Sequence, residues 1–172
     1  MKNKIKLKEL KVKDVTKEYV SWMNDKDIIR FTEISKRQTL KSIKEYVKKK
    51  YKSKNEYLYG IYVQLDDKNS YAHIGNIKLG PINFKHKFSE ISYFIGDKKK
   101  WKKGYGTAAI KQIAIISKKK FGLKKLQAGF ININQASKKV LINNNFKFEG
   151  LFKSQRILEN KRYDSCWYGK II

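Results

Sequence analysis

The sequence predicts an α/β fold, and three observations support this class. Segments with the spacing of amphipathic helices alternate with segments rich in β-branched and aromatic residues. In the middle of the chain the order is strand, helix, strand, helix, strand, which is typical of parallel strands joined by a crossover helix. The length of 172 residues, of which 41% are hydrophobic, suits one domain, 1–172, with a substantial core.

The N-terminal half contains two predicted helices. A strand is expected at about residues 3–11, and Asp14 is the candidate N-cap of a helix that is interrupted at residues 24–27. Thr39 is the candidate N-cap of a second helix, which reaches Tyr51. Further strands are predicted at 57–63, 72–79 and 90–95, with a turn at 66–69 and a loop at 80–83.

The C-terminal half contains the crossover helix. This helix is predicted over residues 104–120, with inward-facing side chains at Ile110, Ile113, Ala114 and Ser117. A strand at 125–131, a helix at 135–143 and strands at 148–156 and 162–171 follow. The last strand is rich in apolar residues, which either complete the core or form an edge that pairs with a second subunit, so a monomer and a homodimer both stay open.

The net charge of +26 invites a nucleic-acid interpretation. Only four of the 41 basic residues are arginines, namely Arg30, Arg37, Arg156 and Arg162, which leaves 37 lysines spread along the chain. Arginine binds phosphates and bases in a bidentate manner, whereas lysine supplies a point charge. We therefore interpret the lysines as a solvated surface that attracts anionic ligands in general, and keep a non-catalytic nucleic-acid-binding module as the alternative from a different class.

Other features bear on the compartment. No run of about 18 apolar residues is present, so no membrane span is expected. The basic N-terminus has no apolar stretch behind it and does not resemble a signal peptide. Cys166 is the only cysteine, and we expect a packed, unreactive thiol in a protein of the reducing cytoplasm.

The segment from Trp101 to Thr107 is suited to binding a diphosphate. Gly104 and Gly106 allow the backbone to curl so that several N–H groups point at one spot, and the helix that follows adds the positive end of its dipole. Nearby positive charge comes from lysines 98, 99, 100, 102 and 103. The pattern G-x-G-x-x-G fails because Ala109 occupies the third position, and a bare glycine pair is also found at ordinary helix starts.

Together with a second motif, this turn resembles the GNAT superfamily of N-acetyltransferases. Motif A of that family, Q/R-x-x-G-x-G/A, fits here with Trp101 in the first position. The residues from Trp101 through Thr107 look like those of the branch of ribosomal-protein N-terminal (alanine/serine) acetyltransferases. The family's N-x-x-S…G-F helix is matched by Asn134, Ser137 and Phe146, with Asn145 in place of glycine. Asparagine is the next best residue for a left-handed helix end. The resemblance covers essentially the whole chain.

The resemblance implies a GNAT-type central mixed sheet of six to seven strands flanked by about four helices, with splayed fourth and fifth strands. Acetyl-CoA would be the cosubstrate, without a metal, and an amine would attack its thioester directly. Pantetheine would lie between the splayed strands, and backbone groups near Phe94 would bind the thioester oxygen. The implied acetyl-CoA-binding residues are Tyr93, Phe94, Ile95, Lys102, Lys103, Gly104, Tyr105, Gly106, Thr107, Asn134 and Ser137.

Three residues are candidates for proton transfer. Relatives often place a glutamate where Glu90 begins its strand, and a carboxylate beside an apolar pantetheine arm suits a base that works near neutral pH. His86 is the rival base, and a surface glutamate paired with a lysine is the alternative for Glu90. Many GNAT enzymes carry a tyrosine acid where this chain has Leu141. Ser137 is therefore a candidate partner of the leaving sulfur, and departure of an unprotonated thiolate is the alternative.

Two acceptors stay open at this point. One is the α-amino group of a protein, as in the ribosomal-protein branch, which we slightly favour. The other is a small amine such as an amino sugar on a nucleotide carrier, because the segment 80–83 with His86 resembles uncharacterised members that we associate with such pathways. The side chains that could grip the diphosphate of such a carrier, or could equally be core and surface residues, are Trp22, Arg30, Phe31 and Arg37.

Overall fold

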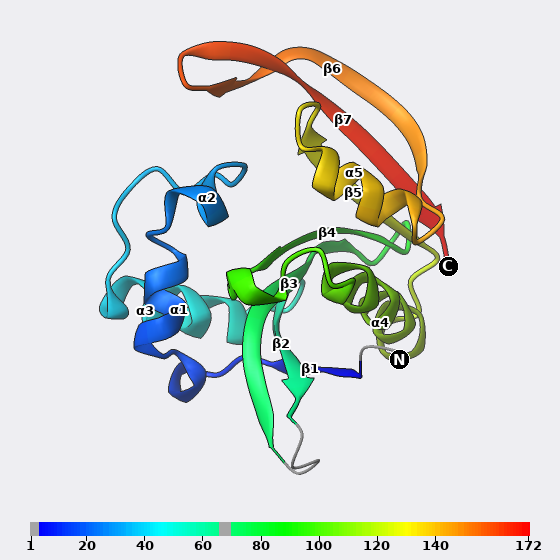
Figure 1. Cartoon of the computed structure of the whole chain (residues 1–172). Helices are drawn as coiled ribbons and strands as arrows, with labels where there is room; N and C mark the ends of the chain where they lie inside the picture. The colour runs from blue at the N-terminus through cyan, green and yellow to red at the C-terminus, as the bar shows by residue number, and fades with distance from the viewer. Residues whose placement is uncertain (1–3, 66–69) are drawn as a thin grey trace.

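The computed structural model describes residues 4–65 and 70–172, and in this part of the chain it contains a mixed seven-stranded sheet covered by helices on both faces (Figure 1). The strand order is β1-β2-β3-β4-β5-β7-β6. The strands are β1 (Ile5–Glu9), β2 (Tyr57–Gln64), β3 (Tyr71–Asn83), β4 (Phe88–Ile95), β5 (Lys125–Ile131), β6 (Lys147–Leu158) and β7 (Lys161–Ile171). The helices are α1 (Lys17–Trp22), α2 (Lys26–Ile29), α3 (Leu40–Tyr51), α4 (Tyr105–Phe121) and α5 (Gln135–Ile142), with short 3-10 turns η1 (Val12–Asp14) and η2 (Lys98–Lys100). The predicted α/β class is confirmed.

Two hydrophobic clusters lie on opposite faces of the sheet. One packs α4 and α5 against the strands and includes Ile77, Ile110 and Leu126, none of which is exposed. The other packs α1, α2 and α3 against the opposite face and contains Tyr19 and Val47. Because side chains alternate along a strand, single strands contribute to both clusters. The sheet therefore separates the two clusters, and an opening between two of its strands connects the two faces.

The first helices begin later than the sequence predicted. Asp14 does not cap α1. It ends η1, where its carboxylate accepts the Lys11 N–H at 2.8 Å, and Thr16 is the N-cap, accepting the Tyr19 N–H at 3.1 Å. Threonine and aspartate are both good caps, so local pattern alone did not separate them. The interruption at residues 24–27 also starts a short helix, because Asp25 caps α2.

The second predicted cap is confirmed. The Thr39 side chain accepts the Ser42 N–H at 3.1 Å at the start of α3. In the crossover helix, the four side chains predicted to face inward are all buried. The turn expected at 66–69 lies outside the described residues.

The loop predicted at residues 80–83 is wrong, because β3 continues to Asn83. A register shift between Leu79 and Ile82 carries the chain past Pro81, which has no N–H to donate to a ladder. Pairing then resumes with Ile82 opposite Ser89, and the Ile82 N–H donates to the Asn55 carbonyl at 2.8 Å. The glycine and proline that signalled a loop mark a bulge inside a long strand.

The last strand is not an edge. β7 lies between β5 and β6, so β6 is the terminal strand on this side, and most of its side chains are exposed. In Figure 1 the β6–β7 hairpin extends from the sheet toward α2. Within the described residues, no helix is long and apolar enough to cross a lipid bilayer.

His73 is a structural residue of β3 and makes stability depend on pH. Its ring packs on Tyr62 and Trp22 at centroid distances of 4.9 and 5.1 Å, and burial lowers the pKa of His73 below its ordinary 6.5. The unfolded chain therefore takes up this proton at a higher pH than the folded one. Stability from the neutral ring is complete above about pH 6.5 and is lost as the pH falls toward the folded pKa.

We expect His73→Gln to reduce the loss in unfolding free energy between pH 7.5 and 5, because the variant has no imidazole that the unfolded chain protonates first. Urea unfolding at both pH values measures this difference. His86→Gln, in the only other histidine and on an exposed turn, is the matched control and should keep the wild-type dependence. An equal pH dependence in wild type and His73→Gln would contradict the assignment.

Candidate active site

The central feature of the site is a gap in the sheet between β4 and β5. These parallel strands pair only at three positions, where Phe88–Glu90 lies opposite Lys125–Gln127. Beyond Glu90, β4 continues against β3 as far as Ile95, and β5 continues against β7 as far as Ile131. The predicted splay is therefore present, and a cavity of about 560 Å³ is lined by both strands and by α1, α3 and α5.

Side-chain alternation along β4 distinguishes the two faces of the sheet at this cavity. Phe94 faces the α1–α3 side, where its ring lies 6.3 Å from Tyr19 and 6.4 Å from Trp22. Glu90 and Ser92 share that face, because they are two and four residues away from Phe94. Tyr93 points to the opposite side, where its ring contacts Gly106 of α4. The gap thus places a carboxylate on one face and a tyrosine on the other.

The backbone of β4 alternates in the same way. The Gly96 N–H donates to the Ile74 carbonyl at 2.7 Å, so two residues earlier the Phe94 amide also faces β3. The amides of Tyr93 and Ile95 consequently face the gap. The Ile95 carbonyl accepts the indole N–H of Trp101 at 2.8 Å. This bond fastens the turn before α4 to the end of β4, which explains a tryptophan at the first position of the turn.

The turn itself reverses through two residues in the left-handed region, Lys102 at φ 58° and Gly104 at φ 79°. The first hydrogen bond of α4 runs from the Ala108 N–H to the Gly104 carbonyl at 3.0 Å. The preceding amides of the first turn, from Tyr105 to Thr107, therefore point out of the helix end, as at any helix N-terminus. A Cβ at Gly106 would lie only 3.1 Å from the Tyr93 ring, so the second glycine allows α4 to approach β4.

The lysines near this turn do not all surround it. Lys98 binds Asp25 at 2.8 Å and Asp27 at 2.7 Å, and so it fastens η2 to the start of α2. This corrects the expectation that Lys98 adds charge to the turn, since two carboxylates neutralise it. Lysines 99, 100, 102 and 103 lie at the turn, and three of them are exposed.

Helix α5 supplies another wall of the cavity, beside the first turn of α4. Asn134 caps it by accepting the Ser137 N–H at 3.0 Å, and both residues line the cavity. The Ser137 side chain interacts with the Tyr93 hydroxyl, and burial raises the pKa of Tyr93 to about 12. The phenol therefore keeps its proton near neutral pH. Leu141 is fully buried in the core and lies outside the cavity lining.

Two further residues hold α5 in place. Asn145 ends the helix region at φ 62°, which confirms its predicted left-handed conformation. The neighbouring Asn144 is buried and donates to the Val140 carbonyl at 2.9 Å and the Thr107 carbonyl at 3.2 Å. Asn144 thereby ties α5 to the first turn of α4. Sequence reasoning missed it because both carbonyls are backbone groups that no motif marks.

Glu90 lies where the gap begins and lines the cavity. Its carboxylate accepts from the Gln127 side chain at 3.4 Å, and none of the ion pairs found in the described part of the chain involves it. Its backbone is held by Ser89, whose hydroxyl donates to the Glu90 carbonyl at 3.1 Å. His86 instead lies on the exposed turn between β3 and β4, outside the cavity lining. The structure thus brings Glu90, and not His86, to the site.

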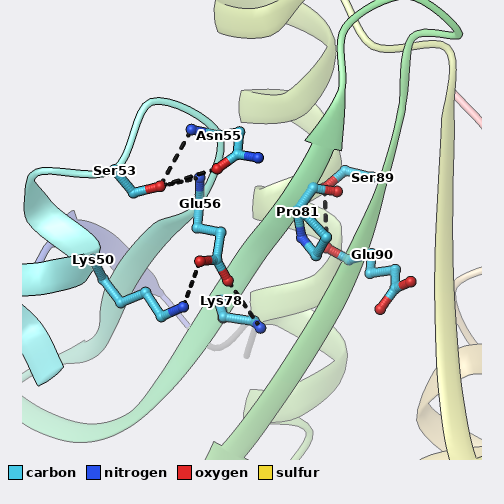
Figure 2. Close-up of polar contacts among 8 residues, drawn as sticks. All are labelled: Lys50, Ser53, Asn55, Glu56, Lys78, Pro81, Ser89 and Glu90. Atoms are coloured by element: carbon cyan, nitrogen blue, oxygen red, sulfur yellow. Dashed lines mark hydrogen bonds and ion pairs between the residues drawn. The ribbon is translucent and has the colours of Figure 1, made fainter.

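A charged cluster that the sequence did not reveal borders the α1–α3 side. Figure 2 shows Lys50 and Lys78 reaching one Glu56 carboxylate, while Glu90 points away from this cluster on the neighbouring strand. The distances from Glu56 are 2.5 Å to Lys50 and 3.4 Å to Lys78. Burial opposes ionisation of Glu56, but the two lysines outweigh it and lower its pKa. Lys78 also lines the cavity, where its charge is paired with that of Glu56.

The segment between α2 and α3 closes the cavity against the β6–β7 hairpin. Glu33 pairs with Arg156 of β6, and both side chains line the cavity. Arg30 pairs with Glu159 at the hairpin tip at 3.3 Å. Of the residues considered for gripping a diphosphate, Phe31 lines the cavity and Trp22 is buried in the core, whereas Arg37 is exposed outside the lining.

The sequence matches the acetyltransferase (GNAT) domain family over residues 4–147, and the chain belongs to this family. No curated protein matches it. The structure is similar to spermidine N-acetyltransferase from Vibrio cholerae in complex with CoA and spermine, with 17% identity, a TM-score of 0.85, and coverage of 97% of this chain and 95% of that one.

Two other solved structures are comparably similar. RimL, a ribosomal L7/L12 alpha-N-protein acetyltransferase in complex with coenzyme A, has 16% identity and a TM-score of 0.85, covering 100% of this chain and 96% of that one. The microcin C7 self-immunity acetyltransferase MccE, in complex with acetyl-CoA and AMP, has 18% identity and a TM-score of 0.81, covering 100% and 94%. At these identities the similarity establishes the fold, and the first two proteins are named for different acceptors, spermidine and the ribosomal protein L7/L12.

Proposed function

We propose that this protein transfers the acetyl group of acetyl-CoA to a primary amine by direct attack. The observation that carries the proposal is the gap between β4 and β5, with the N-terminus of α4 on one face and the Glu90 carboxylate on the other. Pantetheine lies in the gap beside Tyr93 and Ile95, whose amides face it. Lys102, Lys103, Gly104, Tyr105, Gly106 and Thr107 hold the diphosphate at the turn and helix end.

The reaction divides between the two faces. The amine enters from the α1–α3 side, and its nitrogen forms a bond to the thioester carbon while Glu90 takes up the proton, directly or through water. The amides that face the gap stabilise the negative oxygen, which is worth most in a site that excludes water. The carbon–sulfur bond then breaks. Ser137, supported by the Tyr93 hydroxyl, donates a hydrogen bond to the leaving sulfur. Phe94 holds the pantetheine by packing, and Asn134 holds it by a polar contact.

The acceptor that we propose is a protein N-terminal amine, and an amino sugar is the second candidate. The net charge of +26 favours a neutral or anionic carrier over a polycation. An α-amino group also loses its proton easily, since its ordinary pKa is about 8.

Calorimetric titration with acetyl-CoA, followed by a thiol-release assay, tests the proposed function. We expect saturable binding of acetyl-CoA and thiol release that depends on an added amine. A wild-type protein that does not bind acetyl-CoA would contradict the proposal. Binding of nucleic acid without thiol release from any amine would favour the non-catalytic alternative.

A further inference from the structure

Asn76 of β3 presents an amide without a partner at the cavity. The residue is only 2% exposed and lines the cavity on the α1–α3 side, opposite Phe94 in the strand pair. Its Nδ2 makes no hydrogen bond of good geometry among the described residues, and a contact of the Asn76 side chain with the Tyr19 hydroxyl could use only one of its two hydrogens. Buried amide donors are normally paired, because leaving one unpaired costs free energy.

The orientation of this amide follows from His73. The His73 Nε2 lies 2.9 Å from the Gly75 carbonyl oxygen and 2.8 Å from the Asn76 Oδ1. A carbonyl only accepts, so Nε2 carries a hydrogen, and the Asn76 atom that it meets has to be the oxygen. The NH₂ group of Asn76 is thereby directed away from His73. Rings of the α1–α3 side hold His73 in turn, so the orientation is built into the packing.

Trp167 of β7 is a second unpartnered donor on the other side of the gap. It lies opposite Gly129 of β5, and a Cβ at that glycine would be 2.8 Å from the indole, so the ring covers the glycine. Gly129 is two residues from Gln127, the partner of Glu90, and Trp167 therefore shares the face of Glu90. Its Nε1 is buried without a hydrogen-bond partner among the described residues, and the residue lines the cavity.

We propose that Asn76 and Trp167 donate hydrogen bonds to oxygen atoms of the acceptor. The acceptor is then an amine that carries carbonyl or hydroxyl oxygens near its nitrogen, as the first residue of a peptide and an amino sugar both do. An aliphatic polyamine has no such oxygen and leaves both donors unpaired. This inference rests on the proposed acetyl transfer.

The test compares three acceptors in the thiol-release assay: a peptide that begins with Ser, glucosamine and spermidine. We expect the wild type to use the peptide, the sugar or both in preference to spermidine. Comparison of the rates with the peptide and with glucosamine shows which of these two oxygen-bearing amines is the better acceptor. Asn76→Leu and Trp167→Phe should each lower kcat/KM for the preferred acceptor about ten- to a hundredfold, the usual consequence of an unsatisfied or lost hydrogen bond. The acetyl-CoA dissociation constant should not change.

Ser117→Ala is the matched control, because the Ser117 hydroxyl is also buried without a partner in the described chain but lies in α4 outside the cavity lining. It should keep the wild-type kcat/KM. Trp167→Phe keeps most of the ring over Gly129, so it provides a test even where Asn76→Leu fails to fold. Preference for spermidine, no turnover of either oxygen-bearing amine by a protein that binds acetyl-CoA, or unchanged kcat/KM in both variants would overturn the inference. Failure of acetyl-CoA to bind would instead overturn the proposed function.

Discussion

Gly104→Glu is expected to weaken acetyl-CoA binding about 30- to 150-fold. The carboxylate would stand at the turn where the α4 amides and the surrounding lysines favour a diphosphate. Two like charges about 4 Å apart repel by about 4 kcal/mol at an effective dielectric of 20, and exposure reduces this to about 2–3 kcal/mol. Calorimetric titration with acetyl-CoA measures the change.

The control for this substitution has to separate charge from backbone strain. Gly104 has φ 79°, which an ordinary side chain adopts at a cost. Gly104→Asn tolerates that conformation without adding charge, so it should retain most of the affinity. Equal losses in Gly104→Asn and Gly104→Glu would show that strain at the turn, and not repulsion of a diphosphate, is responsible.

Glu90→Gln is expected to lower kcat about a hundredfold or more, the usual effect of removing a general base. The amide keeps the size of the side chain and can still bond to Gln127, so the gap should keep its shape and acetyl-CoA affinity should stay within about twofold, inside the scatter of a neutral change. Steady-state thiol release with a saturating amine, together with calorimetry, measures both quantities.

His86→Gln serves as the comparison, because the exposed turn places it outside the cavity lining. Its turnover should match that of the wild type. Full activity in Glu90→Gln with a large loss in His86→Gln would return the base role to the histidine. Full activity in both variants would assign proton removal to water.

The motifs that we assign to acetyl-CoA binding were visible in the sequence because each is local. The glycines at 104 and 106 follow a strand and open a helix, and Asn134 caps the next helix three residues before Ser137. Such signals depend on backbone geometry over a few residues, which side-chain chemistry determines directly. The same local character explains two errors. Near Asp14 two good cap residues lie close together, and at residues 80–83 glycine and proline are typical both of a loop and of a bulge, so composition did not distinguish the alternatives.

The acceptor side was decided by the tertiary structure. Its charged members come from segments far apart in the chain, as with Glu33 and Arg156, and no spacing relates them. Whether Glu90 or His86 reaches the cavity depends on where β4 leaves β5, and whether Asn76 lacks a partner depends on how His73 is packed. By itself the sequence determined the α/β class, the turn before α4 and the candidate residues for binding acetyl-CoA. Only the fold determined which side chains meet across the gap, because strand pairing and sheet faces are set by long-range packing.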